Sequence, residues 1–395
     1  MERILTERNG YVLDCLFDNR RAVELRIDPI ENESCIGNIY IGRVKDVVPS
    51  IGAAFVDIGL ESNAFLPFSD LGGHTIFTKK PSKKEIAPDD EVLVMVSREP
   101  VKTKPANVTT KLSIPGKYSV VSYDRKNAIS FSRKIFDNDW KKTVQEGCDM
   151  SADGISVIVR TNAYYADASV IYGEINTLIE RLRGIIQGAQ FKARTAKPVY
   201  EALPGWLCDI RDTNSQMLDA IITDSQNIYN RIRSLGDVLA LNDKLKMYTQ
   251  SYPLIKNYSV EKAVAETVHE RVWLDSGAYL IIQPTEALTV IDVNSGKSER
   301  GRDNEAAYLK VNLEAAAEIA RQLRLRNLSG IIVVDFINMK DPKNETELLC
   351  ALKEMVKSDP VQVAIAGISN LGLVEITRKK VRKPITHAQT DLFFG

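Results

Sequence analysis

The chain has 395 residues and equal numbers of basic and acidic side chains, 52 Lys and Arg against 52 Asp and Glu, so its formal net charge is zero. This balance argues against a polybasic protein that binds nucleic acid by bulk charge alone. Hydrophobic residues make up 44% and charged residues 26%, an ordinary globular composition. No apolar stretch reaches the roughly 18 residues of a membrane span, and the first residues lack the apolar core of a signal peptide. We therefore expect a cytoplasmic protein.

The cysteines are widely spaced and form no C-x-x-C pair, and only three histidines accompany them. They are Cys15, Cys35, Cys148, Cys208 and Cys350. A disulfide framework needs a paired set, and a zinc site needs clustered Cys and His ligands. We expect inert thiols and no structural zinc.

The first part of the chain is rich in short β-type runs. Residues 11–17 and 22–27 flank a polar turn and predict a hairpin. From residue 37 to 96, further short runs are separated by glycine and proline. Strands at this spacing are typical of a small closed β-barrel.

The middle of the chain contains strand and helix signals. Residues 155–159 predict a strand, and residues 167–190 predict a helix because apolar residues recur at helical spacing. Residues 215–245 are expected to be mainly helical after a strand-like start, and residues 260–273 to form another helix. We expect these regions to contribute packing rather than chemistry.

The last third predicts an α/β layer. Residues 278–284 and 287–293 form a predicted hairpin, followed by a long helix at 305–326. Residues 330–337 (GIIVVDFI) predict an almost wholly apolar strand, and residues 371–376 a final strand. This alternation of strands and helices indicates helices packed on a sheet.

Two acidic residues interrupt the apolar strands of this layer, Asp292 in TVIDVNSG and Asp335 in IIVVDFINM. A carboxylate inside a buried strand is costly unless a cation or hydrogen bonds compensate it. If the two strands are neighbours, the carboxylates converge, and Asn294 lies on the same strand face as Asp292. Oxygen ligands of this kind suit a hard cation such as Mg²⁺, which can activate water and offset charge on a phosphoryl group.

Spacing alone leaves another interpretation open, in which Asp292 and Asp335 cap turns at strand ends. Basic residues that follow each strand favour the metal site. They lie in the loop 297–302 and in the run Arg378, Lys379, Lys380, Arg382 and Lys383. An acidic pair with a basic rim is typical of a phosphodiester site, although a charge run by itself is more often a solvated face.

Phenylalanines of the predicted barrel give a second candidate site. Phe55 and Phe65 lie in GAAFVDIG and NAFLPF, where core packing is the default role of such side chains. If they are exposed beside cations, they could instead stack unpaired bases. The candidate cations are Arg43, Lys45, Lys102 and Lys104.

On these residues the chain resembles the ribonuclease E/G family of bacterial endoribonucleases. The resemblance extends over nearly the whole chain, and its strongest blocks are IGRVKDVVPSIGAAFVDIGLESNAFLPFSDL, VIDVNSGK, NLEAAAEIARQLRLR, GIIVVDFINM and ISNLGLVEITRKKVRKP. It implies an enzyme that cleaves single-stranded RNA to 5′-phosphate and 3′-hydroxyl products in RNA processing, rRNA processing and mRNA decay. A non-catalytic single-stranded RNA-binding protein with a weak or vestigial metal site is the alternative.

The resemblance also implies residue roles. Asp292 and Asp335 match the family's metal-binding aspartates, for Mg²⁺ or Mn²⁺, and Asn294 matches the asparagine that supports them. The positions that match RNA contacts in the family's OB-fold domain are Phe55, Phe65 and Lys104. The positions that match its pocket for a 5′-monophosphate are Gly116, Val120, Arg160 and Thr161. An ordinary surface ion pair is the alternative role for Arg160.

The family architecture implies four subdomains in a mixed α+β chain. Residues 1–36 and 205–267 would form an RNase H-like subdomain, with an OB-fold RNA-binding domain at 37–112 and a 5′-sensor subdomain at 113–204 inserted into it. Residues 268–395 would form a DNase I-like catalytic subdomain.

Two departures from the family pattern stand out. Gln362 takes the position of a further arginine in the 5′-phosphate pocket, so we expect weaker sensing of the 5′ end. The family's C-P-x-C zinc motif does not follow the basic stretch, and no cysteine follows Cys350. We expect any homodimer to form without the family's zinc link.

Overall fold

The computed structural model describes residues 1–79, 85–100, 104–148, 154–236, 241, 243–296, 305–382 and 384–395. The chain divides into two compact units. The first unit comprises Met1–Asp28, Leu218–Arg231 and Lys244–Gly395, and the second comprises Pro29–Met217 and Ile232–Asp243. The finer division into four subdomains, with RNase H-like and DNase I-like parts, stays a prediction.

The first unit begins with a five-stranded sheet in the order β14-β13-β1-β2-β3. Its strands are β1 (Glu2–Arg8), β2 (Tyr11–Asp18), β3 (Arg21–Pro29), β13 (Ala220–Thr223) and β14 (Leu245–Met247). The predicted hairpin is confirmed as β2 and β3, and β13 joins β1 in parallel. The short helices α6 (Leu254–Asn257) and α7 (Val260–Val268) pack on the sheet through apolar residues such as Leu254 and Val264. The region predicted to be mainly helical also contains α4 (Gln226–Ser234).

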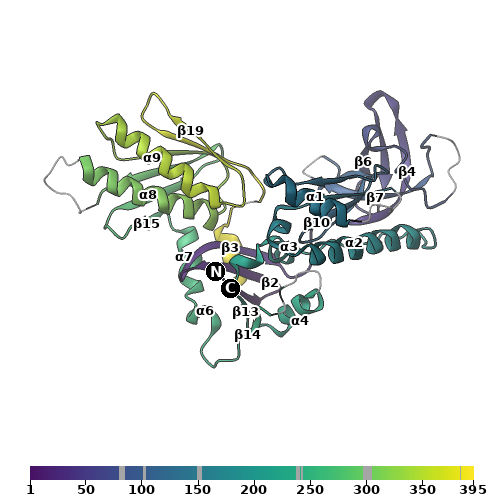
Figure 1. Ribbon diagram of the computed structural model, residues 1–395, viewed down its shortest axis with the longest axis horizontal. Helices are drawn as coiled ribbons and strands as arrows, with labels where there is room; N and C mark the ends of the chain where they lie inside the picture. The colour runs from purple at the N-terminus through teal and green to yellow at the C-terminus, as the bar shows by residue number, and fades with distance from the viewer. Residues whose placement is uncertain are drawn as a thin grey trace. The chain divides into compact units, whose positions relative to one another are not determined.

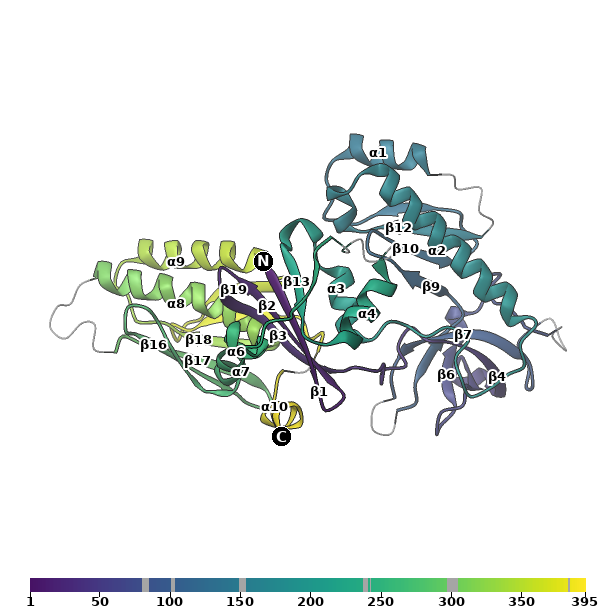
Figure 2. The same cartoon turned by 90° about the horizontal axis from the view of Figure 1, so that it is seen from below.

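A six-stranded sheet forms the rest of the first unit, in the order β15-β16-β17-β18-β20-β19. The strands are β15 (Arg271–Trp273), β16 (Tyr279–Pro284), β17 (Leu288–Asn294), β18 (Gly330–Asp335), β19 (Val363–Ile368) and β20 (Val374–Arg378). β17 and β18 are parallel, and helix α8 (Glu305–Leu325) lies between them in the sequence. Figures 1 and 2 show α8 and α9 (Pro342–Met355) side by side on one face of the sheet. The predicted hairpin, long helix and apolar strand are confirmed.

The helix predicted at 260–273 is wrong in its second half. Helix α7 ends at Val268, and Arg271–Trp273 form the edge strand β15, which pairs antiparallel with β16. The middle residue, Val272, is buried in the core of this sheet. Sheet pairing and burial of a β-branched residue therefore override the helical periodicity of the segment before it.

The second unit contains the predicted barrel, which is closed and has five strands in the order β4-β5-β6-β8-β7, as expected of an OB-like domain. The strands are β4 (Ile39–Val48), β5 (Ala53–Asp57), β6 (Ala64–Pro67), β7 (Glu91–Arg98) and β8 (Asn107–Thr109). The interior is apolar and tightly packed. Gly42 shows this, because a Cβ atom there would lie 2.4 Å from Cγ1 of Val56.

A four-stranded sheet completes the second unit in the order β11-β12-β10-β9. Its strands are β9 (Leu112–Pro115), β10 (Ser119–Tyr123), β11 (Ile129–Phe131) and β12 (Ile155–Val159). The long helix α2 (Ala168–Ala189), predicted from periodicity, packs its apolar side on the sheet through Ile171, Ile175 and Leu178. Helices α1 (Asn138–Gly147) and α3 (Gly205–Asp212) also belong to this unit. Within the part of the chain described, no helix combines the length and apolarity needed to cross a membrane.

Candidate active site and phosphate pocket

Asp292 and Asp335 lie directly opposite each other on the parallel strands β17 and β18. Neighbouring strands are about 4.8 Å apart, so the two carboxylates start from adjacent points of the sheet. The predicted convergence is therefore confirmed. Asp292 lies two residues before the end of β17, so the alternative of a turn cap does not fit it, whereas Asp335 is the last residue of β18 and is at a strand end, as that alternative expects.

Both carboxylates are exposed, whereas their neighbours Ile291, Val293 and Val334 are buried. Alternate side chains of a strand point to opposite faces, and α8 and α9 cover only the apolar face (Figure 2). The expectation that Asp292 and Asp335 are buried in the sheet is therefore wrong. They need no cation to compensate burial, and they are open to an approaching substrate.

Asn294 supports one of these carboxylates, as its position on the same strand face predicts. Its Nδ2 donates a hydrogen bond of 2.7 Å to Oδ2 of Asp292. Among the described residues, no group of three or more His, Cys, Asp or Glu side chains could hold a metal. Two carboxylates suit a hard cation that retains several of its waters, as Mg²⁺ commonly does.

The described part of the predicted basic rim does not lie beside the acidic pair. The loop 297–302 and Lys383 lie outside the described residues. Arg378 is buried, and its Nε lies 2.8 Å from Oδ2 of Asp359. In register, Arg378 pairs with Gly330, at the start of β18, whereas Asp335 is at its end. Five residues of strand span about 17 Å, so the cations that follow Arg378 begin at the far end of the strand from the acidic pair.

The barrel presents the predicted aromatic pair. Phe55 and Phe65 are cross-strand partners on β5 and β6, with ring centroids 6.0 Å apart in an edge-to-face arrangement. Both are half-buried, so the core-packing interpretation is wrong for these two rings. Phe55 and Lys104 line one depression of about 940 Å³, which three glutamates also line.

The other candidate cations of the barrel contribute less. Arg43 lies 2.8 Å from Asp89, and Lys45 lies 3.7 Å from Asp57. Lys102 lies outside the described residues. Among the described candidate cations, Lys104 is therefore the one that lines the same depression as the half-buried Phe55.

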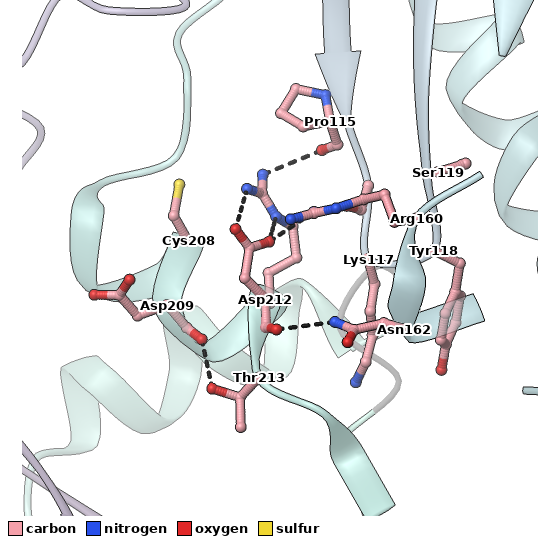
Figure 3. Close-up of polar contacts among 12 residues, drawn as sticks. Pro115, Lys117, Tyr118, Ser119, Arg160, Asn162, Cys208, Asp209, Asp212 and Thr213 are labelled. Atoms are coloured by element: carbon pink, nitrogen blue, oxygen red, sulfur yellow. Dashed lines mark hydrogen bonds and ion pairs between the residues drawn. The ribbon is translucent and has the colours of Figure 1, made fainter. Parts of the chain in front are cut away.

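Arg160 and Gly116 of the predicted phosphate pocket are in contact. Nη1 of Arg160 donates to the carbonyl oxygen of Gly116 at 2.6 Å. It also donates to Oδ1 of Asp212 at 2.7 Å (Figure 3). Thr161 follows directly, and its hydroxyl lies 2.8 Å from that of Ser132. Val120 lies on β10 opposite Pro115 and Ile158, on the two neighbouring strands.

A second guanidinium, from Arg211 at the end of α3, joins this pocket. Its Nε donates to Oδ1 of Asp212 at 2.8 Å, and its Nη1 donates to the carbonyl oxygen of Pro115 at 3.2 Å. Burial alone would raise the pKa of Asp212, but hydrogen bonds and charge from Arg160 and Arg211 lower it overall. Arg160 thus belongs to a charged network and not to an isolated surface pair.

Sequence reasoning missed Arg211 and Asp212 because their distance from Arg160 along the chain gives no local signal. The adjacent Arg-Asp dipeptide is ordinary for the end of a helix. Only the packing of α3 beside the turn between β9 and β10 brings it to Arg160.

Gly116 has a packing role that the sequence did not reveal. The carboxylate of Glu174 accepts hydrogen bonds from the backbone N–H groups of Lys117, Tyr118 and Ser119 and from the Ser119 hydroxyl. A Cβ atom at Gly116 would lie 2.5 Å from Oε1 of Glu174. The turn therefore requires glycine to admit this carboxylate.

Paired carboxylates on an open sheet, half-buried aromatic rings on a small barrel and two guanidiniums bridged by a carboxylate are groups of the kind that proteins acting on nucleic acid use. The model of the ribonuclease E/G family matches residues 113–381. The chain is 32% identical to ribonuclease G of Escherichia coli K12 over 379 residues, which cover 92% of this chain and 76% of the relative. It is 31% identical to ribonuclease G of Haemophilus influenzae, covering 93% and 77%. Identity to ribonuclease E of a Nostoc species is 34%, covering 87% of this chain and 51% of the relative. The chain belongs to the ribonuclease E/G family, a family of endoribonucleases.

Proposed function

We propose that the protein is a magnesium-dependent endoribonuclease that cleaves single-stranded RNA to 5′-phosphate and 3′-hydroxyl products, in RNA processing and mRNA turnover in the cytoplasm. The observation that carries the proposal is the register pairing of Asp292 with Asp335 on the open face of the sheet. A decayed site would be expected to lose a carboxylate, and both are present here. The alternative of a purely RNA-binding protein has no comparable observation in its favour.

Asp292 and Asp335 would hold the metal, and the Asn294 amide would fix the orientation of Asp292 through its 2.7 Å hydrogen bond. A bound Mg²⁺ supplies an activated water and neutralises charge on the phosphoryl oxygens. The exposure of both carboxylates allows a phosphodiester to approach from solvent. The protein's contribution is to place two negative charges at adjacent points of a rigid sheet.

The barrel would bind the RNA strand through Phe55, Phe65 and Lys104. Half-exposed rings can stack on bases of any sequence, and a lysine beside them can contact the phosphates. The three glutamates around the same depression disfavour a second phosphate there. We therefore expect Lys104 to contact a single phosphate while the rings hold the neighbouring bases.

The pocket around Arg160 would bind a terminal 5′-phosphate. Arg160 and Arg211 supply two guanidiniums, and Thr161 supplies a hydroxyl. Arg211 offers a second cation in a protein that has Gln362 where the family has an arginine. Asp212 already bridges the two guanidiniums, so a phosphate must compete with its carboxylate. Gln362 in place of the family arginine and the competing Asp212 carboxylate both predict only a modest preference for 5′-monophosphorylated over 5′-hydroxyl RNA.

The proposal is tested by incubating the purified protein with a labelled single-stranded RNA in Mg²⁺, in Mn²⁺ and in EDTA. We expect cleavage in either metal and none in EDTA, with downstream products that a ligase can join directly because they carry a 5′-phosphate. A double-stranded RNA of the same sequence is the control and should stay intact. Intact single strands at every metal concentration, with RNA still bound, would support the non-catalytic alternative.

A further inference from the structure

An arginine and two aromatic residues occupy the same sheet face as the acidic pair. Residues directly opposite each other on paired strands point to the same face. One row across the sheet joins Arg271, Ile281, Asp292 and Asp335. The next row joins Trp273, Tyr279 and Asn294. The candidate active site therefore continues across two strands to the edge strand β15.

The two rings and the guanidinium are in contact with one another, and the ring planes are inclined at 57°. The ring centroids of Trp273 and Tyr279 are 5.2 Å apart. Cζ of Arg271 lies 4.8 Å from the Tyr279 centroid and 5.7 Å from the Trp273 centroid. Within the described ranges of the chain, the Arg271 side chain has no hydrogen bond or ion pair, so its charge is not matched by a carboxylate. We call Arg271, Trp273 and Tyr279 the edge cluster.

The exposure of Trp273 is not explained by packing. Its side chain is 62% exposed, whereas Val272 beside it is buried in the core. Burying a large aromatic side chain is worth several kcal/mol, and this strand places it in solvent instead. An aromatic ring that is exposed to solvent and contacts a neighbouring cation offers a flat face on which a nucleic-acid base can stack.

The edge cluster is held at a fixed place beside Asn294. Gly296, just after β17, packs on the carbonyl oxygen of Gly277 in the turn before β16, where a Cβ atom would come within 2.3 Å. Ser276 of the same turn donates its backbone N–H to Glu314 of α8 at 3.0 Å. Trp273 is two strands from Asn294, which corresponds to about 10 Å. A nucleoside whose phosphate lies at Asp292 and Asp335 can span this distance.

We propose that the edge cluster binds a base of the RNA strand next to the phosphodiester that is cleaved, with the exposed Trp273 ring stacking on the base, Tyr279 packed against that ring, and Arg271 contacting the adjoining phosphate. The proposal rests on the proposed function of Asp292 and Asp335. It explains why a cation and two rings share the exposed rows with the carboxylates. Arg271 also offsets the negative charge that would repel a phosphate.

The test combines protein variants with modified RNA. Cleavage of a labelled single strand is measured for the wild-type protein, Trp273→Ala, Trp273→Phe and Tyr252→Ala. Each variant receives the intact strand and strands with one abasic nucleotide at successive positions around the cleavage site. Tyr252 is a matched control because it is also a highly exposed aromatic residue of the first unit.

We expect Trp273→Ala to lower kcat/KM on the intact strand by about 5- to 150-fold, the range of one lost base stack. Trp273→Phe should recover most of the activity, and Tyr252→Ala should match the wild type. One abasic position near the cleavage site should impair the wild type but have little further effect on Trp273→Ala. Unchanged kcat/KM for Trp273→Ala, or equal losses at every abasic position in both proteins, would overturn the proposal.

RNA binding, measured in EDTA by fluorescence anisotropy, separates this proposal from the proposed function. If the wild type cleaves RNA and Trp273→Ala both binds and cleaves normally, only the edge cluster fails. If the wild type does not cleave, the nuclease assignment fails, and the edge cluster is judged by binding. In that case, weaker RNA binding by Trp273→Ala than by Tyr252→Ala would support the edge cluster. Equal RNA binding by the two variants would overturn it.

Discussion

Nη1 of Arg160 lies 2.7 Å from Oδ1 of Asp212, and the same oxygen accepts a 2.8 Å hydrogen bond from Arg211. One carboxylate thus bridges two guanidiniums, which is the way a phosphate group would be bound between them. Asp212 therefore acts as an internal competitor in the pocket proposed for the RNA 5′ end. Several consequences can be measured.

Replacing Asp212 with Asn removes the competing charge and keeps one hydrogen-bond acceptor. We expect Asp212→Asn to bind 5′-monophosphorylated RNA several-fold more tightly, with little change for 5′-hydroxyl RNA, because two cations become available to the phosphate. Anisotropy with a matched pair of oligonucleotides checks this. Glu180→Gln, which removes an exposed charge from α2, is the control. An unchanged ratio would show that Asp212 does not compete with the ligand.

The same residue predicts a pH dependence of stability. The pKa of Asp212 is lowered from its ordinary value of 3.8 by the two arginines, against the effect of burial. Its ion pairs therefore stabilise the protein above that value, and this contribution is lost as the pH falls through the lower pKa of the folded protein. In urea unfolding at pH 7, the free energy of unfolding should be higher for the wild type than for Asp212→Asn. This difference should narrow below about pH 4. A difference in the free energy of unfolding that does not change with pH would contradict a stabilising role for the ion pairs of Asp212.

Gln362→Arg restores the residue expected from the family pattern. We expect this variant to increase the ratio of cleavage rates for 5′-monophosphorylated and 5′-hydroxyl RNA, because the family pattern has a phosphate-binding cation at this position. Gln362→Lys tests whether charge alone is sufficient. A wild-type ratio that is already large, and unaffected by either variant, would show that Arg160 and Arg211 suffice.

Gly116→Ala separates packing from ligand binding in the same pocket. The new methyl group would meet the Glu174 carboxylate and displace the acceptor of three backbone N–H groups. We expect a loss of about 1–3 kcal/mol in the free energy of unfolding. Gly173→Ala, on α2 where a Cβ atom meets nothing within 4 Å, is the control. Equal stability of both variants would contradict the tight approach at Gly116.

Arg378 gives the opposite kind of prediction, because it lies in a basic run but is buried. Its guanidinium contacts Asp359, the Asn327 side chain and the Leu328 carbonyl oxygen. Removing one partner of a buried pair leaves an uncompensated charge, so Arg378→Ala should destabilise the protein by about 3–5 kcal/mol. The exposed neighbour Lys379 serves as a control, and Lys379→Ala should be nearly neutral in thermal unfolding. Similar melting temperatures for the two variants would place Arg378 outside the core.

The sequence was sufficient for features that depend on local pattern. Alternating apolar residues predicted β2, β3, β16, β17 and β12, and apolar residues at helical spacing predicted α2 and α8. The sequence predicts that Asp292 and Asp335 converge only if their strands are neighbours, and the parallel pairing of β17 and β18 meets that condition.

Features that depend on tertiary packing were not predictable. The exposure of Asp292 follows from α8 and α9 covering one sheet face only, which the composition of the strand does not reveal. Arg378 resembles a surface charge because its partner Asp359 is distant in sequence. β15 is too short to show a period, so Arg271 and Trp273 were assigned to the helix before them.

The most direct test of the central claim is cleavage of one defined single-stranded RNA in Mg²⁺ by Asp292→Asn and Asp335→Asn. Glu286→Gln, an exposed carboxylate in the turn between β16 and β17, is the control. We predict that each Asp→Asn variant loses cleavage while its RNA affinity stays within a few-fold of the wild type, and that Glu286→Gln cleaves normally. Undiminished cleavage by either Asp→Asn variant would contradict the account.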